Sequence, residues 1–361
     1  MTNIVSIATE LPLYKHPQKS ILAFMQNAYG LNAIDARKLS FLYTQSAIDF
    51  RYSVIADYGT DVSHWQFIPT EKNTPYPSLE NRMEIYNKES VALSIKAIEK
   101  CIDGKIEKEK ITHLITVSCT GMSAPGLDLL LMEELELPST IQRTSINFMG
   151  CYAAIHALKM AQQIAESSNE NVNIVLVATE LCTLHFQQEY SIETASSSML
   201  FADGCAAVLL NNYSIENSFA QLKFFFSKVN FTGKKDMAWQ LSSTGFLMTL
   251  SGYIPQIIEA DIQQLVTDAL QQYGLEQNQI THWCIHPGGK KIVDVIQQQL
   301  NLTNQQVEPS RKVLREYGNM SSPTILFVLK EILEEIKDNK AIIFGIAFGP
   351  GLTMETFIAI K

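Results

Sequence analysis

Long apolar runs and paired cysteines are both absent from this 361-residue sequence. No apolar run reaches the roughly 18 residues that a helix needs to cross a bilayer, so we expect no membrane span. The six cysteines include no C-x-x-C pair, which argues against a zinc site or a disulfide framework. The opening MTNIVSIATELPLYKHP lacks a basic segment followed by an apolar core and a cleavage site. We therefore expect a reduced, globular, cytoplasmic protein.

Positive charge is also scarce, since 28 Lys and Arg residues stand against 37 Asp and Glu residues, for a formal net charge of -9. This balance argues against nucleic acid or an anionic membrane as the main partner. The histidines other than His286 show no metal-ligand spacing with cysteines or acidic residues, and we expect no metal. With 46% hydrophobic residues, the chain is long enough for two domains or one large duplicated fold.

Two segments of the chain read alike: ITHLITVSCTGMSAPGLDLLLMEELEL from Ile111 and ITHWCIHPGGKKIVDVIQQQLNL from Ile280. Each runs from an apolar strand through a break at glycine into an amphipathic helix. Each is followed by a turn, a helix and two further apolar strands. Alternating strands and helices predict an α/β fold with parallel-rich sheets, and two copies predict a pseudo-twofold molecule layered helix–sheet–helix–sheet–helix. The halves divide into 1–215 and 216–361, within the polar stretch NNYSIENSFAQ.

Three residues suited to thiol chemistry fall at breaks between these predicted elements. Cys151 follows INFMG where a helical pattern begins, and a helix start favours a thiolate. His286 closes a strand in IHPGG, and Asn319 stands in the turn YGNMSS. The duplication would bring these loops together near the pseudo-axis. Each residue also has an ordinary structural interpretation: Cys151 as a small core residue, His286 as a turn cap, and Asn319 as a turn residue or helix cap.

Taken together, the three residue types match one reaction better than others. A histidine can activate a thiol for acyl transfer. Once an acyl group is on sulfur, decarboxylation of a malonyl thioester produces an enolate whose oxygen needs hydrogen-bond donors. A neutral histidine and an asparagine amide supply two donors without an acid that would quench the enolate. The trio therefore favours a decarboxylative Claisen condensation over hydrolysis, which would prefer an acid to orient the histidine.

FMGCYAA, IHPGG, EYGNMSSPTILFVL and GIAFGPGLTMET occur in this order and together resemble the type III polyketide synthases, the chalcone-synthase-like branch of the thiolase superfamily. The resemblance runs across nearly the whole chain and implies a homodimer with a thiolase-like, duplicated αβαβα fold. It implies that Cys151 carries an acyl starter, while His286 and Asn319 decarboxylate malonyl-CoA. The chain would be extended iteratively and cyclised to a pyrone, resorcinol or phloroglucinol. No metal or organic cofactor beyond CoA thioesters is implied.

The resemblance also assigns residues around the cavity. Phe201, in SSSMLFADGCAAVLL, takes the place of a gatekeeping phenylalanine, and Met248 replaces a second one. Cys119 stands where plant enzymes have Thr, and His185 lies just past an apolar strand. We expect both at the cavity, although a structural role for each stays open. These departures from the plant pattern favour an aliphatic or small acyl starter.

The expected CoA site is altered. Of three basic positions that the family places on an early helix, this chain keeps only Lys38, with Phe41 and Gln45 at the other two. Lys290 and Lys291 could compensate at a helix N-terminus, or they are solvated surface lysines. Delivery of the starter by an acyl-carrier protein therefore stays open beside acyl-CoA. Three other functions also stay open: a single-round ketoacyl-ACP synthase, a catalytically inactive thiolase-fold partner protein, and a cysteine hydrolase.

Overall fold

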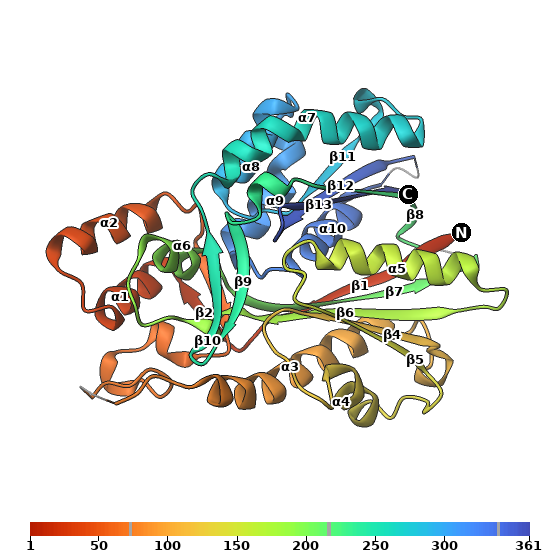
Figure 1. Cartoon of the computed structure of the whole chain (residues 1–361). Helices are drawn as coiled ribbons and strands as arrows, with labels where there is room; N and C mark the ends of the chain where they lie inside the picture. The colour runs from red at the N-terminus through yellow and green to blue at the C-terminus, as the bar shows by residue number, and fades with distance from the viewer. Residues whose placement is uncertain (72–73, 215–217, 338–339) are drawn as a thin grey trace.

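The computed structural model describes the chain except residues 72–73, 215–217 and 338–339. Among the described residues, nine strands form one sheet in the order β11-β12-β13-β8-β1-β7-β6-β4-β5 (Figure 1). No helix within these described ranges is long and apolar enough to cross a membrane. The predicted boundary between residues 215 and 216 lies outside the described residues.

Equivalent helices and strands appear twice along the chain. The first set consists of β1 (Thr2–Glu10), α3 (Leu79–Ile102), β4 (His113–Ser118), α4 (Leu127–Glu134), β5 (Gln142–Asn147), α5 (Ala153–Ser167), β6 (Asn173–Leu181) and β7 (Asp203–Asn211). The second set consists of β8 (Ala220–Val229), α7 (Ile254–Tyr273), β11 (His282–Ile285), α8 (Lys290–Gln299), α9 (Asn304–Tyr317), α10 (Thr324–Glu335), β12 (Ile342–Gly349) and β13 (Thr353–Ile360). The other helices and strands are β2 (Tyr14–Pro17), α1 (Gln18–Ala28), α2 (Ala33–Thr44), β3 (Phe50–Ser53), α6 (Ile192–Leu200), β9 (Met237–Ser242) and β10 (Gly245–Leu250).

The repeated Ile-Thr-His motif makes the same hydrogen bond in both halves. The Thr112 hydroxyl donates to the carbonyl of Asn173 at 2.9 Å, and the Thr281 hydroxyl donates to the carbonyl of Ile342 at 3.0 Å. Each acceptor is the first residue of the strand, β6 or β12, that lies parallel to the strand of the motif. The equivalent strands β1 and β8 pair antiparallel, as two strands related by a twofold axis do. These contacts confirm the predicted duplication.

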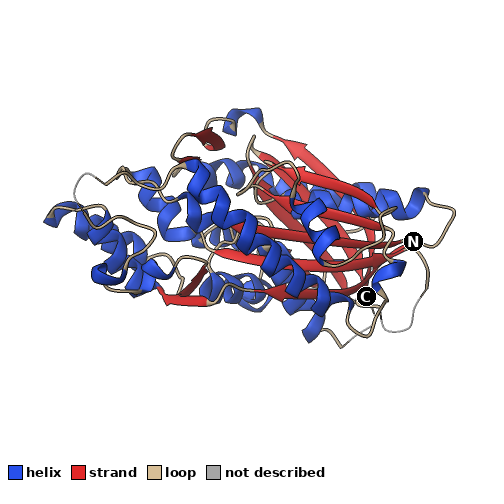
Figure 2. Ribbon diagram, turned by 90° about the horizontal axis from the view of Figure 1, so that it is seen from below, coloured by secondary structure: helices blue, strands red, loops and turns tan. Residues whose placement is uncertain are grey.

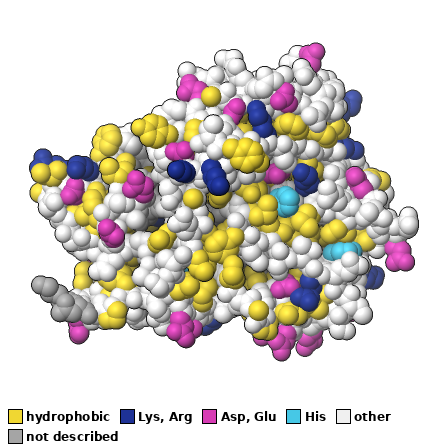
Figure 3. Space-filling model, in the orientation of Figure 1, with side chains coloured by type: hydrophobic (Ala, Val, Ile, Leu, Met, Phe, Trp, Pro, Cys, Tyr) yellow, Lys and Arg dark blue, Asp and Glu magenta, His cyan; other side chains and the backbone are white. Residues whose placement is uncertain are grey.

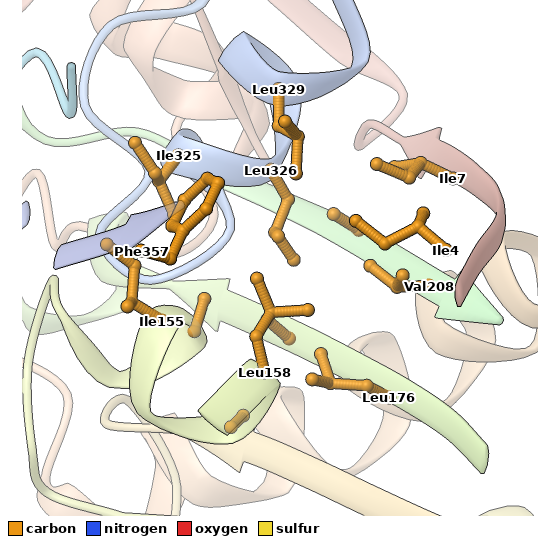
Figure 4. Close-up of a cluster of buried hydrophobic side chains, with 14 of the residues drawn as sticks. Ile4, Ile7, Ile155, Leu158, Leu176, Val208, Ile325, Leu326, Leu329 and Phe357 are labelled. Carbon is orange, nitrogen blue, oxygen red and sulfur yellow. The ribbon is translucent and has the colours of Figure 1, made fainter. Parts of the chain in front are cut away.

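Helix layers alternate with the two halves of the sheet. Successive residues of β6 face opposite sides: Leu176 packs in the core around α5 and α10, and Val177 packs in the core under α3. Figure 4 shows Leu158 of α5 and Leu326 of α10 in the shared core, beside Phe357 of β13. The outer faces are covered by α3 and α4 on one half and by α7 and α8 on the other. Seen from below in Figure 2, strands run between helices as the predicted layers require.

The prediction of parallel-rich sheets is wrong. Within the described part of this sheet, β4–β5, β4–β6 and β11–β12 are parallel. The other five pairings are antiparallel. A parallel pair needs a long crossover, whereas β12 turns directly back into β13 between Gly349 and Thr353. The sequence pattern revealed the crossover helices but not these direct returns.

Candidate active site

A small enclosed cavity of about 30 Å³ lies where the loops after β4, β5, β6 and β11 meet. Such loop clusters at the carboxyl ends of strands are where α/β folds place their sites. The β9–β10 hairpin, beside α6 at the left end of the sheet in Figure 1, adds Trp239 and Met248 to the lining. Cys151, His286 and Asn319 all line this cavity. The structure therefore brings together the three residues that the sequence singled out.

Cys151 lies in the turn between β5 and α5, just ahead of the helix that begins at Ala153. Gly150 precedes it with a φ of 83°, and a Cβ there would collide with Pro350. Glycine thus allows the turn to pack against the loop between β12 and β13. The Cys151 thiol is buried, with its Sγ 3.6 Å from the Oγ of Ser321.

Asn319 lies between α9 and α10, and its backbone fixes it beside the end of α6. Its N–H donates to the carbonyl of Leu200 at 3.0 Å, and its carbonyl accepts from the N–H of Ala202 at 2.9 Å. The side-chain Oδ1 accepts from the N–H of Ser321 at 2.8 Å. Because that oxygen is held, the amide nitrogen is the part of the side chain left to donate, and the Asn319 side chain lowers the pKa of the Cys151 thiol. The amide is thus presented to any group carried on the sulfur.

His286 directly follows β11, and its backbone N–H donates to the carbonyl of Ile346 at 2.8 Å. Its side chain is buried, and neither ring nitrogen has a hydrogen-bond partner among the described residues. Burial lowers the pKa of the imidazole to about 3, so the ring is neutral at neutral pH. Buried polar atoms without partners are rare because they cost free energy. Both ring nitrogens are therefore available to a substrate.

The thiol is not the resting thiolate that its place before a helix predicted. Burial raises the pKa of Cys151 to about 11. The side chains of Ser321 and Asn319 lower the pKa only in part, and the charge of Glu180 raises it. Desolvation in a closed cavity outweighs the favourable field of the helix start. Cys151 and His286, which line the same cavity, therefore rest as a neutral pair, a thiol and an imidazole, and the shift of the thiol pKa is opposite to the one that the helix start favours.

A second cavity, of about 50 Å³, adjoins the first. Phe201, Met248, Cys182 and Trp239 line both cavities and so form the partition between them. Phe201 directly follows α6, and its carbonyl accepts from the Nη1 of Arg51 at 2.5 Å. The two residues expected at gatekeeping positions thus lie between the two cavities, and gating by them stays a prediction.

Cys119 lines the first cavity from the end of β4. Its Sγ accepts from the N–H of Gly150 at 3.0 Å, and its carbonyl accepts from the indole N–H of Trp239 at 2.7 Å. Burial raises the pKa of this thiol well above its usual value. Cys119 therefore holds the turn that carries Cys151 as well as facing the cavity.

Comparisons with known proteins identify the family. The family models described as chalcone and stilbene synthases, N-terminal and C-terminal domains, match residues 2–213 and 221–360. The chain belongs to the chalcone and stilbene synthase family. It is 28% identical over 367 residues to type III polyketide synthase A of Arabidopsis thaliana, covering 98% of this chain and 91% of the relative. It is 29% identical to type III polyketide synthase C of the same plant, covering 89% and 85%.

Solved structures of type III polyketide synthases share the fold. PKS-I of the brown alga Ectocarpus siliculosus superposes with a TM-score of 0.90 at 26% identity, covering 100% of this chain and 98% of that one. The C-terminal type III domain of Steely1, a type I/III hybrid from Dictyostelium, also gives 0.90, at 24% identity and with 100% and 99% coverage. These findings confirm membership of the type III polyketide synthases and the thiolase-like, duplicated fold.

His185 of this type III synthase lines the second cavity but is not among the residues lining the first. Its Nδ1 accepts from the N–H of Phe246 at 3.1 Å, and its Nε2 lies 2.7 Å from the carbonyl of Thr120. The ring stacks on Phe246, and burial lowers its pKa to about 3. Because the backbone occupies both nitrogens, His185 can meet a ligand only with its carbon atoms.

The three lysines predicted to bind CoA are not among the residues that line either cavity. Lys38 pairs with Asp35 at 2.9 Å on α2, and Lys290 pairs with Asp294 at 2.7 Å on α8. Lys291 is exposed on α8. On the face shown in Figure 3, basic side chains are spread among acidic and apolar ones instead of forming one patch. CoA binding by these lysines stays a prediction.

Glu180 is a site residue that the sequence analysis did not select. It lies fully buried near the end of β6, where its carboxylate accepts from the Cys119 N–H at 2.9 Å, the Thr120 hydroxyl at 2.8 Å and the Ser322 hydroxyl at 2.7 Å. Burial raises the pKa of this carboxyl to about 7. An acidic residue closing the otherwise apolar VNIVLVATE was the available signal.

Proposed function

We propose that the protein condenses acyl starters with malonyl-CoA by repeated decarboxylative Claisen reactions on Cys151. One observation carries the proposal: a thiol, a neutral imidazole and a held amide line a single enclosed cavity. The two ring nitrogens of His286 are unpartnered among the described residues, and the side chain of Asn319 lowers the pKa of the Cys151 thiol. Family membership supports the same chemistry.

Loading begins with the neutral pair. As the Cys151 sulfur attacks the thioester carbonyl, His286 accepts the thiol proton. The C–S bond to CoA then breaks, and the imidazolium returns that proton to the departing CoA sulfur. The products are an acyl-Cys151 thioester and free CoA, and the imidazole is neutral again.

Extension uses the same side chains differently. Malonyl-CoA loses CO₂, and the electron pair of the broken C–C bond forms an enolate. We infer that the His286 N–H and the Asn319 amide N–H donate to its oxygen, because both lie where that oxygen must approach the sulfur. The enolate carbon attacks the acyl carbonyl, the C–S bond to Cys151 breaks, and the sulfur takes up a proton from solvent. The extended chain, now on CoA, reloads for another round.

Several finer points belong to the same proposal. Phe201 and Met248 gate the passage between the cavities, and Cys119 borders the reacting group. The starter is small or aliphatic and arrives on CoA or on a carrier protein. Cyclisation ends the sequence, and the thiol, imidazole and amide suffice without a metal or organic cofactor.

We also propose that the synthase works as a homodimer in the cytoplasm. The strand β5 is an edge of the described sheet, and most of its side chains are exposed. An edge of this kind can pair with a second copy. Light scattering after gel filtration would measure the mass, and a monomer across the working concentration range would contradict the dimer.

Mass spectrometry of products tests the main proposal. The protein is incubated with malonyl-CoA and a panel of acyl-CoA starters, beside Cys151→Ala and the matched control Cys101→Ala, which changes a buried cysteine of α3 that lines neither cavity. Multiply extended pyrones, resorcinols or phloroglucinols that vanish only in Cys151→Ala are expected. A single condensation would indicate a ketoacyl synthase, and free acid without a new C–C bond would indicate a hydrolase. Untouched malonyl-CoA with every CoA-bound and carrier-bound starter would indicate an inactive partner protein.

A further inference from the structure

The proposed condensation needs two turns of the chain to stay in register. Cys151 lies in the turn between β5 and α5, and Asn319 lies in the turn between α9 and α10, in the other half of the duplicated fold. The Cys151 Sγ meets the second turn at the Oγ of Ser321, 3.6 Å away. A thiol forms weak hydrogen bonds, so this contact alone holds the turns loosely. Because a misplacement of about 1 Å can cost about 10²-fold in rate, their register needs support from behind.

Glu180 lies behind both turns, and one of its carboxylate oxygens reaches the turn of Cys151. The Oε2 of Glu180 accepts from the backbone N–H of Cys119 at 2.9 Å. The Cys119 Sγ accepts in its turn from the backbone N–H of Gly150 at 3.0 Å, and Gly150 directly precedes Cys151. One intermediate residue therefore links the carboxylate to the turn that carries the thiol.

The other carboxylate oxygen of Glu180 reaches the turn of Asn319. Its Oε1 accepts from the hydroxyl of Ser322 at 2.7 Å, and both side chains are fully buried. Ser322 directly follows Ser321, whose N–H donates to the Oδ1 of Asn319 at 2.8 Å. The carboxylate thus holds the same short segment that fixes the orientation of the amide.

The fold holds Glu180 in a fixed place at a cost in stability. Glu180 belongs to β6, where it pairs with Gly204 of β7. Its third donor is the hydroxyl of Thr120 at 2.8 Å, which also accepts from the N–H of Leu181 at 2.9 Å. All three of these donors are uncharged, and burial raises the pKa of the carboxyl to about 7. A carboxyl buried in this way lowers stability at high pH, which favours a functional reason for its presence.

We propose that Glu180 is a positioning residue for the condensation, whose two carboxylate oxygens join the turn of Cys151 to the turn of Asn319. This inference rests on the proposed function, in which Cys151 carries the acyl chain and the enolate forms beside Asn319. Glu180 is not among the residues that line the first cavity, so it acts through its neighbours and does not touch the substrate. Loading uses Cys151 and His286, whereas CO₂ release also uses Asn319. Loss of the link should therefore slow CO₂ release more than loading.

Glu180→Asp and Glu180→Gln separate the reach of this side chain from its charge. Aspartate keeps the charge but is one methylene shorter, so it cannot contact the Cys119 N–H and the Ser322 hydroxyl together. Glutamine loses the charge but keeps the length, so its oxygen can accept from the Cys119 N–H while its NH₂ donates to the Ser322 oxygen. For each variant, intact-protein mass spectrometry measures acylation of Cys151 by a panel of acyl-CoA thioesters, and a second assay measures CO₂ release from malonyl-CoA.

The readout is the ratio of the rate of CO₂ release to the rate of loading, because a general loss of folded protein lowers both rates equally. Glu180→Asp should lower this ratio about tenfold or more, and Glu180→Gln should recover it to within about threefold of the wild-type value. Ser322→Ala removes one contact and should lower the ratio about three- to tenfold. The matched control Ser310→Ala should leave it unchanged, because the buried Ser310 hydroxyl has no hydrogen-bond partner among the described residues.

If Glu180→Asp does not fold, Ser322→Ala decides alone. A ratio that is unchanged in Glu180→Asp or in Ser322→Ala overturns the positioning role and leaves the proposed function standing. A ratio that falls as far in Glu180→Gln as in Glu180→Asp does the same, because charge and not reach would then matter. A folded wild-type protein that neither loads Cys151 nor releases CO₂ overturns the proposed function, and the positioning role with it.

Discussion

Replacing Glu180 by glutamine should raise stability only slightly at pH 5 and much more at pH 8. Burial raises the pKa of this carboxyl from 4.5 to about 7 in the folded chain. Between those pH values the folded state keeps a proton that the unfolded state releases, so the wild-type free energy of unfolding falls as pH rises. A pKa difference of about 2.5 corresponds to about 3 kcal/mol.

Glutamine is a close substitute because the surrounding groups can serve an amide as well. One carboxylate oxygen of Glu180 accepts from the Cys119 N–H and the Thr120 hydroxyl, and the other accepts from the Ser322 hydroxyl. The glutamine oxygen can take the first position, while its NH₂ donates to the Ser322 oxygen. The variant therefore loses the ionisable group without losing a hydrogen bond.

Denaturant unfolding of the wild type and Glu180→Gln from pH 5 to pH 8 measures the effect. The two free energies of unfolding should differ by less than about 1 kcal/mol at pH 5 and by about 3 kcal/mol at pH 8. Burial also raises the pKa of Asp203, to about 6, but this contribution is common to both proteins and cancels in the comparison. A difference that does not change with pH would refute the assignment of a raised pKa to Glu180.

Three further predictions concern the reaction. Alkylation of Cys151 by iodoacetamide, followed by peptide mass spectrometry, should still accelerate above pH 9 because the thiol pKa is about 11; a plateau below pH 8 would contradict the neutral pair. Asn319→Ala should reduce CO₂ release from malonyl-CoA by about 10²- to 10³-fold, with a much smaller loss of acyl loading; equal losses would argue against a role at the enolate. Phe201→Ala should join the two cavities and shift products to longer chains in mass spectra, and an unchanged product profile would mean that Phe201 does not limit the chain.

The duplicated fold could be predicted because each copy of the strand and helix pattern is visible within a short stretch of sequence. In the Ile-Thr-His motif, Thr112 and Thr281 each stand directly before a strand. Each hydroxyl donates to the carbonyl of the first residue of the neighbouring parallel strand. The mixed direction of the sheet was not predictable in this way. It depends on whether a strand returns directly to its neighbour, as β12 does to β13, and the alternation of helices and strands does not record that choice.

The residues of the candidate site also fall into those that local sequence predicted and those that it did not. Cys151, His286 and Asn319 were predictable because each lies at a break between elements, and the duplication brings those breaks together. Glu180 and Arg51 were not selected, since their importance comes from burial among residues distant in sequence. Arg51, for example, reaches Phe201 across 150 positions. A basic residue in a short polar strand carries no local sign of such a contact.

The raised pKa of the Cys151 thiol has a physical consequence for the proposed reaction. A protonated His286 would stabilise a resting thiolate, but an acid in contact with the enolate would also quench it. Burial lowers the pKa of His286 to about 3 and raises that of Cys151 to about 11, so the ion pair is disfavoured from both sides. Proton transfer must then coincide with attack on the thioester, and the imidazole is neutral again before malonyl-CoA reacts. The desolvation that prevents a resting thiolate therefore keeps His286 in the form that the carbanion step needs.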